Sequence, residues 1–235
     1  MNAFADMSPF AGMGMTGAEL LSDESPMPDH ETRSGPKSLS GFGPGVMIET
    51  SEGPQPVEWL RPGDLLLTRD HGYQPLLWVG RSALDEAHVI KPLRIFAGAL
   101  GEHAPERDLI LSPDHHILLS APQIELYFAE AEVFVPVSDI ATEAEAAYAI
   151  PHPEYAYCHL LMKEHEVLLA EGVWIESLFA DERTLSMLPS ETVMSLLTKL
   201  EPNHRNTETA RMMLKRGEAL ALQLRSAIAA RRIAA

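Results

Sequence analysis

Short apolar runs that alternate with glycine- and proline-containing turns most limit what this chain can fold into. Such spacing is typical of short strands joined by tight turns, because Gly and Pro favour turn conformations and weaken the interior of a strand. The sequence therefore predicts a mainly β, closed or sandwich-like body over residues 39–180. The predicted strands are Val46–Thr50, Val57–Trp59, Leu65–Thr68, Leu76–Val79, Leu93–Phe96, Leu109–Leu111, Ile117–Leu119, Val133–Val137, Cys158–Met162, Val167–Ala170 and Val173–Ile175.

The N-terminal residues have a different composition from the β body. Residues 1–38 are rich in Met, Gly, Ser, Pro and acidic residues, and their apolar positions follow no sustained period. This composition predicts a disordered or flexible leader with a short helix near Thr16–Leu21.

The C-terminal residues 181–235 predict a helical hairpin packed against the β body. Ser190 has the position of a helix N-cap before an apolar run at Val193–Leu200. Pro202 ends that run, and apolar residues recurring on one face predict a second, longer helix from Thr207 to Arg232. These helices are where we expect self-association or a protein partner, and the sequence identifies no specific partner.

Composition and charge exclude several classes of function. The net charge of −16 argues against nucleic acid as a general partner, because phosphate binding needs a basic face. The single cysteine, Cys158, rules out an internal disulfide and makes a cysteine-based zinc site improbable. Apolar runs are too short to span a bilayer, and the N-terminus lacks the features of a secretory signal. We expect a cytoplasmic protein, or one exported without a cleaved N-terminal signal, with no membrane segment and no cofactor.

Three motifs in order carry a resemblance to a known family. The first is Gly41-Phe42-Gly43-Pro44-Gly45-Val46-Met47-Ile48, followed by Val57-Glu58-Trp59-Leu60-Arg61-Pro62-Gly63-Asp64. The second is Ser112-Pro113-Asp114-His115. The third is His159-Leu160-Leu161-Met162, then His165-Glu166-Val167-Leu168-Leu169-Ala170-Glu171-Gly172, with Glu176-Ser177-Leu178-Phe179 after it. Together they resemble the Hint domain, the self-processing fold of hedgehog proteins and inteins, and most closely its bacterial Hint-like type. The resemblance implies an all-β horseshoe or disk of short strands.

The resemblance also implies a chemistry and a set of site residues. In this family a Cys or Ser at the start of the first motif attacks the carbonyl of the residue before it, turning an amide into an ester or thioester. Ser112 matches the hydroxyl that steadies the tetrahedral oxyanion, and His115 matches the histidine that distorts or protonates the departing amide nitrogen. His165 is either at a family site position or a plain strand histidine, and His116 is expected to face solvent or to pack elsewhere.

This chain departs from the family pattern at both ends of the reaction. Gly41 occupies the nucleophile position and has no side chain with which to attack. Ser40 is the candidate nucleophile one residue earlier, which would move the scissile bond to Leu39–Ser40. Splicing also needs an Asn near the end of the domain, where this chain has Glu176. Cys158 is too far along the chain to act as the N-terminal nucleophile and is expected to be a small buried apolar residue.

Three hypotheses follow from these residues. The first is a degenerate Hint domain, retained as a folded module without full splicing activity. The second is an autoprotease that cleaves near residues 39–41 and releases the N-terminal segment. The third is metal binding through the imidazoles of His115, His116, His159 and His165. Whether the chain is an enzyme therefore depends on what stands in for the missing nucleophile.

Overall fold

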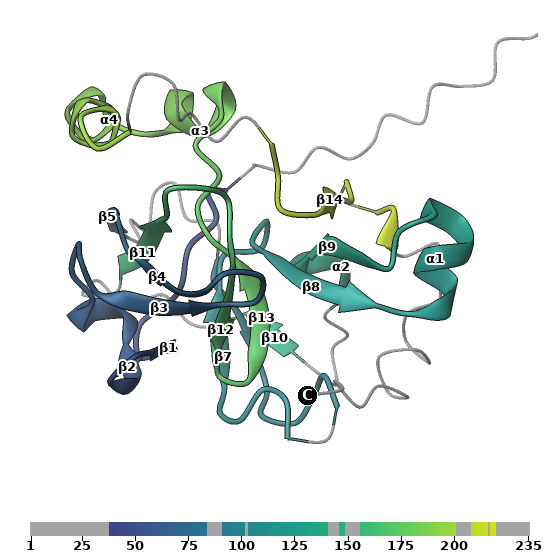
Figure 1. Cartoon of the computed structure of the whole chain (residues 1–235). Coiled ribbons are helices and arrows are strands. Elements are labelled where there is room, and N and C mark those ends of the chain that lie inside the picture. The colour runs from purple at the N-terminus through teal and green to yellow at the C-terminus, as the bar shows by residue number, and fades with distance from the viewer. Residues whose placement is uncertain are drawn as a thin grey trace, which may run out of the picture. The chain divides into compact units, whose positions relative to one another are not determined.

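The β body is built from short strands, and the mainly β class predicted from the sequence is confirmed (Figure 1). The computed structural model describes residues 38–83, 91–101, 103–140, 146–148, 156–200, 208–215 and 217–219. The strands are β1 (Met47–Thr50), β2 (Gly53–Pro56), β3 (Leu65–Thr68), β4 (Gly72–Pro75), β5 (Trp78–Ala83), β6 (Leu93–Ile95), β7 (Leu109–Leu111), β8 (His116–Ser120), β9 (Glu132–Pro136), β10 (Ala146–Tyr148), β11 (Ala156–Leu161), β12 (Val167–Ala170), β13 (Val173–Glu176) and β14 (Met212–Met213). The predicted leader up to residue 37, with its helix near Thr16–Leu21, lies outside the described residues.

The helices in the described part of the chain are short. They are the 3-10 turn η1 (Val57–Trp59) and the α-helices α1 (Pro122–Phe128), α2 (Val137–Ile140), α3 (Glu182–Met187) and α4 (Ser190–Leu197). The prediction of a strand at Val57–Trp59 was wrong: the chain turns there after Pro56, whose φ is −57°. None of the described helices is long and apolar enough to cross a membrane.

The C-terminal segment contains the predicted helix that follows Ser190, as α4, and a short helix α3 that the sequence did not predict. The described residues 208–215 do not form the start of the long helix predicted from Thr207. Residues 212 and 213 instead form β14, which runs parallel to β9 and pairs Met212 with Val133. Leu214 is buried, and its backbone N–H donates to the carbonyl of Phe134 at 2.8 Å. Tertiary pairing therefore outweighs local helix propensity in this segment. The part of the predicted helix from residue 220 onward lies outside the described residues.

The described strands form three sheets, and one of these sheets joins distant parts of the sequence. The nine-stranded sheet has the order β14-β9-β8-β13-β12-β1-β3-β4, with β2 paired to β1. The smaller sheets have the orders β10-β6-β7 and β11-β5. Because β8 pairs with β13, in the register Ile117 to Ile175, the turn before β8 lies beside the end of β13. This pairing brings the second and third motifs of the sequence together.

Phe42 lies between two of these strands and anchors the first motif. Its backbone forms isolated bridges with Leu111, at the end of β7, and with Cys158 in β11. Its N–H donates to the Cys158 carbonyl at 2.9 Å, and its side chain is only 1% exposed. The residues just before Phe42 are thereby held against the Ser112–His115 turn that follows β7.

We predict that Phe42→Ala destabilises the domain by about 3–5 kcal/mol, the cost of deleting a buried aromatic side chain. Urea unfolding followed by circular dichroism measures this change. The control is Leu126→Ala, because the Leu126 side chain on α1 is 78% exposed. An equal, small effect of the two substitutions would contradict the placement of Phe42 in the core.

Candidate functional site

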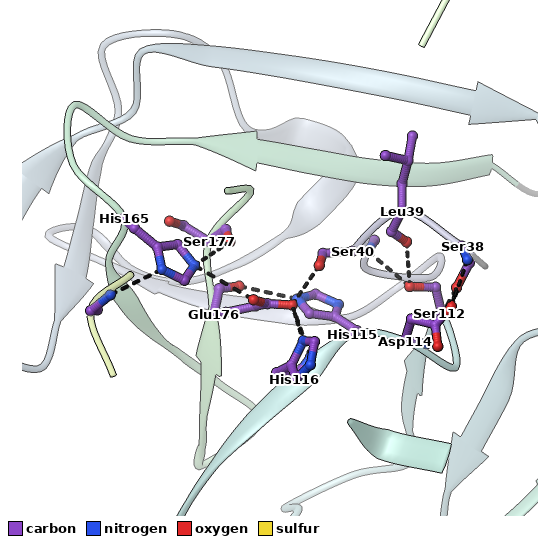
Figure 2. Close-up of polar contacts among 12 residues, drawn as sticks. Ser38, Leu39, Ser40, Ser112, Asp114, His115, His116, His165, Glu176 and Ser177 are labelled. Atoms are coloured by element: carbon purple, nitrogen blue, oxygen red, sulfur yellow. Dashed lines mark hydrogen bonds and ion pairs between the residues drawn. The ribbon is translucent and has the colours of Figure 1, made fainter. Parts of the chain in front are cut away.

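The segment from Ser38 to Gly41 is bound along its backbone by the turn that follows β7 (Figure 2). The Ser38 N–H donates to the Asp114 carboxylate at 2.6 Å. The Ser112 hydroxyl donates to the Leu39 carbonyl at 2.6 Å and accepts from the Gly41 N–H at 3.1 Å. The Ser112 N–H in turn donates to the Gly41 carbonyl at 2.9 Å. Ser112 therefore contacts the peptide groups on both sides of Ser40.

His159, in β11, holds the carbonyl of the Ser40–Gly41 peptide. Its Nδ1 lies 2.7 Å from the Ser40 oxygen, and since a carbonyl only accepts, Nδ1 carries the proton. The Nε2 atom then accepts from the Ser82 hydroxyl at 2.8 Å. Burial lowers the pKa of His159 to about 4, so the imidazole is neutral at physiological pH.

The backbone of Gly41 lies too close to β11 to accept a side chain without movement. A Cβ atom added at residue 41 would be 2.8 Å from Cβ of Tyr157, 3.0 Å from its Cγ and 3.1 Å from Cε1 of His159. Its φ is not in the left-handed region, so the constraint is one of space and not of backbone conformation. The nucleophile position therefore has no room for a side chain unless Tyr157 or His159 moves.

Glu176, at the end of β13, is the buried charge of this site. Its side chain is 0% exposed, and its Oε1 accepts from the Ser40 hydroxyl at 2.5 Å and from Nδ1 of His116 at 2.8 Å. The Oε2 atom lies 3.5 Å from Nε2 of His165 and has no hydrogen-bond partner among the described residues. Burial raises the pKa of Glu176, but the charge and hydrogen bond of His116, with smaller contributions from His165 and His115, hold that pKa well below its usual value.

His115, at the end of the second motif, and the next residue His116 have pKa values shifted in opposite directions. His115 is fully buried, lies edge-on to Phe42 with ring centroids 4.6 Å apart, and directs Nε2 at the Glu176 carbonyl at 3.0 Å. Burial lowers the pKa of His115. The expectation that His116 faces solvent or packs elsewhere was wrong, because it pairs with Glu176 in the same site. Burial lowers its pKa, and the Glu176 carboxylate outweighs that effect and raises it.

His165 connects the site to the C-terminal segment. Its Nδ1 accepts from the Ala210 N–H at 3.1 Å, so Nε2 carries the proton and donates to the Ser177 carbonyl at 3.1 Å. Next to Ala210, Arg211 pairs with Asp70 at 2.8 Å and with Glu132 at 3.0 Å. The segment around Ala210 thus lies against the His165 side of the cluster.

The structure brings the predicted site residues Ser40, Gly41, Ser112, His115 and His165 to one region, as Figure 2 shows for those it labels. Their roles in cleavage stay predictions. Cys158 is buried, as expected of a small apolar residue, and burial raises the pKa of its thiol.

Sequence reasoning missed the contact of His159 with the Ser40 carbonyl. It placed His159 at the start of the third motif and gave its side chain no role except as one of four metal ligands. In the structure the nitrogens of His159 and His165 are bound to backbone and hydroxyl groups. The four imidazoles therefore do not converge on a common ligand point among the described residues. A histidine in an apolar strand gives no signal of such a contact, because it depends on a pairing between residues 119 positions apart.

The sequence profile of the Hint domain family matches residues 40–182, which is more than half of the 235 residues. The chain belongs to the Hint domain family. This Hint domain therefore has the family's self-processing modules as relatives, and its three motifs lie in the matched region. A search of curated proteins gave no match.

Solved structures similar to this Hint domain include three of the intein type. The intein-like domain from Clostridium thermocellum has 14% identity and a TM-score of 0.40, with 59% of this chain and 98% of that chain covered. The gp41-1 intein has 17% identity and a TM-score of 0.32, with coverages of 59% and 98%. A splice-inactive variant of the AceL NrdHF class 3 split intein has 12% identity and a TM-score of 0.37, with coverages of 59% and 97%. Family membership rests on the sequence match.

We predict that Gly41→Ala destabilises the domain by about 1–3 kcal/mol, because the added methyl group overpacks the contact with Tyr157 and His159. Urea unfolding measures the change, with Ser51→Ala in an exposed turn as the control. A Gly41→Ala variant as stable as the parent chain would show that the position is open.

We predict that His159 contributes to acid destabilisation of the fold. The pKa of His159 is about 4 in the folded chain, against an ordinary value of 6.5. Between these two pH values the unfolded state binds a proton that the folded state does not bind. The contribution of neutral His159 to the free energy of unfolding is therefore fully present above pH 6.5. It falls by up to about 3 kcal/mol as the pH drops to 4. The variant His159→Asn keeps a donor for the Ser40 carbonyl and should lose less stability over this range.

Urea unfolding at pH 7.5 and pH 4.5 tests this prediction, with His103→Asn as the control at an exposed histidine. The control should lose as much stability on acidification as the parent chain. An equal loss in His159→Asn would contradict the assigned role of burial.

Proposed function

We propose that this chain is a Hint domain that does not cleave itself at the Ser40–Gly41 peptide and instead retains the N-terminal residues on a folded module. The observation that carries the proposal is the close approach of the Gly41 backbone to Tyr157 and His159. A nucleophile at this position would need space that these two side chains fill. The missing thiol is thus accompanied by a closed reaction centre.

The protonation of His115 supports the same conclusion. The departing amide nitrogen needs a proton for the peptide bond to break. His115 is buried and neutral, because burial lowers its pKa, and its proton lies on Nε2, which donates to the Glu176 carbonyl at 3.0 Å. The Nδ1 atom is then a lone pair with no hydrogen-bond partner among the described residues. His115 in this state is an acceptor and has no proton to give at Nδ1.

The presence of Glu176 is evidence that the C-terminal step of the splicing reaction is absent. That step uses the side-chain amide nitrogen of an Asn as its nucleophile. Glu176 has no amide, and its carboxylate is held ionised, with a pKa well below its usual value. Its contacts with Ser40 and His116 are those of a buried ion pair with an added hydrogen bond.

The function that remains is to hold an extended segment. Each residue from 38 to 41 has at least one backbone group hydrogen bonded to Asp114, Ser112 or His159. Residues 38–41 are thereby bound to the domain, and without cleavage the residues before them stay covalently attached to it. We propose that the domain serves to hold residues 38–41 and, through the uncleaved peptide bond, to keep the chain before them attached.

Intact mass spectrometry tests the proposal. The purified chain should give one species at 25.9 kDa, unchanged by incubation from pH 6 to pH 9 with dithiothreitol or hydroxylamine. The reason is that neither an ester nor a thioester forms at Ser40–Gly41. A fragment beginning at Gly41 would contradict the proposal.

A second candidate function, cleavage at Leu39–Ser40, is favoured by one pair of contacts. The Ser40 hydroxyl donates to Glu176, a proton acceptor, and the Ser112 hydroxyl donates to the Leu39 carbonyl oxygen, where an oxyanion would form. In this reaction Ser40 Oγ bonds to the Leu39 carbonyl carbon and the C–N bond breaks. The Oγ proton passes to Glu176, and the released Ser40 amine takes up a proton. Water then hydrolyses the ester.

The two candidates differ in the fragment that they produce. Cleavage at Leu39–Ser40 predicts a product that begins at Ser40, faster formation with hydroxylamine, and no product from Ser40→Ala. The matched control is Ser38→Ala, which removes a nearby hydroxyl that contacts Asp114 instead of Glu176. Absence of any fragment from the parent chain rejects this candidate and supports the first.

A further inference from the structure

A group of potential metal ligands lies outside the site described above, at one end of β3 and β12. These strands pair with Thr68 opposite Leu168, and the Arg69 N–H donates to the Val167 carbonyl at 2.9 Å. The turn after β3 carries His71, and the loop before β12 carries Glu164 and Glu166. One ligand atom from each of these three side chains lies within 4.8 Å of the other two.

We propose that His71, Glu164 and Glu166 form a binding site for one divalent transition-metal cation, of the class of Zn²⁺ or Co²⁺. The chemistry of the ligands selects this class, because imidazole nitrogen suits zinc and cobalt whereas calcium and magnesium prefer oxygen alone. Three protein ligands leave further positions for water, as in zinc sites with an open coordination position.

The spacing of His71 and Glu166 fits ligands of a single ion. Nδ1 of His71 lies 2.9 Å from Oε1 and 3.1 Å from Oε2 of Glu166. At the tetrahedral angle typical of zinc, two ligand atoms with bonds of about 2.1 Å are about 3.4 Å apart, so His71 and Glu166 would separate by about half an ångström on binding. An ion can therefore replace the proton between these two groups with a small movement of the exposed His71.

The distribution of charge also favours a cation here. The Glu166 side chain is 6% exposed, and a carboxylate placed away from water needs a positive partner. Its hydrogen-bonding and ion-pair partner among the described residues is His71, which is charged only when protonated. The nearby guanidinium groups are engaged elsewhere: Arg69 pairs with Glu132, and Arg211 pairs with Asp70 and Glu132.

The group is accessible to an ion from solvent. The His71 side chain is 54% exposed, and Glu164 is exposed as well. Only Glu166 is buried, so it supplies a fixed ligand while the other two can adjust. Binding therefore needs no opening of the core, and it is independent of whether the chain cleaves itself.

Isothermal titration of the full chain with Zn²⁺, after removal of any affinity tag and treatment with EDTA, tests the proposal. We expect saturable binding of one ion per chain. Removal of a ligand in His71→Ala or Glu164→Gln should weaken it roughly tenfold or more, at least the effect of losing a supporting partner of a metal ligand. Titration with Co²⁺ should give visible absorption bands that the same substitutions remove.

The control is His103→Asn, which removes an exposed histidine elsewhere and suits the positive φ of 70° at that residue. This control should bind Zn²⁺ as the parent chain does. Both ligand substitutions lie at exposed positions, so they leave the core intact, and circular dichroism confirms that each variant is folded. Absence of saturable binding, or equal affinity in the parent chain and His71→Ala, would overturn the proposal.

Discussion

The close approach of the Gly41 backbone to β11 is the constraint on which the rest of the site depends. With no side chain at residue 41, Tyr157 and His159 lie where a Cβ atom would have contacts of 2.8 and 3.1 Å. This proximity lets His159 reach the Ser40 carbonyl and lets Ser112 bond the Gly41 peptide from the other side. A cysteine in the same backbone position would displace β11 or move the segment out of the reach of Ser112. Glycine here is therefore a component of the packing as well as an absent nucleophile.

The charges around Glu176 depend on the same position of the segment from Ser38 to Gly41. The segment held by Ser112 places the Ser40 hydroxyl on the Glu176 carboxylate, and His116 provides the positive charge that a buried carboxylate needs. His115 and His159 stay neutral because burial lowers their pKa values. The result is a buried carboxylate that raises the pKa of His116, beside His115 and His159, whose pKa values burial lowers. Such an arrangement stabilises a fixed geometry, while it leaves His115 without a proton to deliver from Nδ1.

The sequence predicted the strands where local pattern and tertiary pairing agree. Leu65–Thr68 and Val167–Ala170 have the predicted bounds because turn residues end each run. Met212–Met213 forms a strand in a segment with a helical pattern, since pairing with β9 and the ion pairs of Arg211 are not visible in a local window. The motif residues Ser112 and His115 lie close to the first motif, where Ser112 bonds to Gly41 and His115 packs on Phe42. The contacts of His116 and His159 depend on sheet register, which a local window does not show.

The Gly41→Cys variant gives the most direct test of the claim that the nucleophile position is closed. The folded variant is incubated with dithiothreitol at neutral pH, and its intact mass is followed with time, with circular dichroism as the check on folding. The account predicts a single uncleaved species, because Tyr157 and His159 fill the space that the thiol and its attack would need. Thiol-dependent release of a fragment that begins at residue 41 would contradict it, and would mean that the nucleophile alone had been lost.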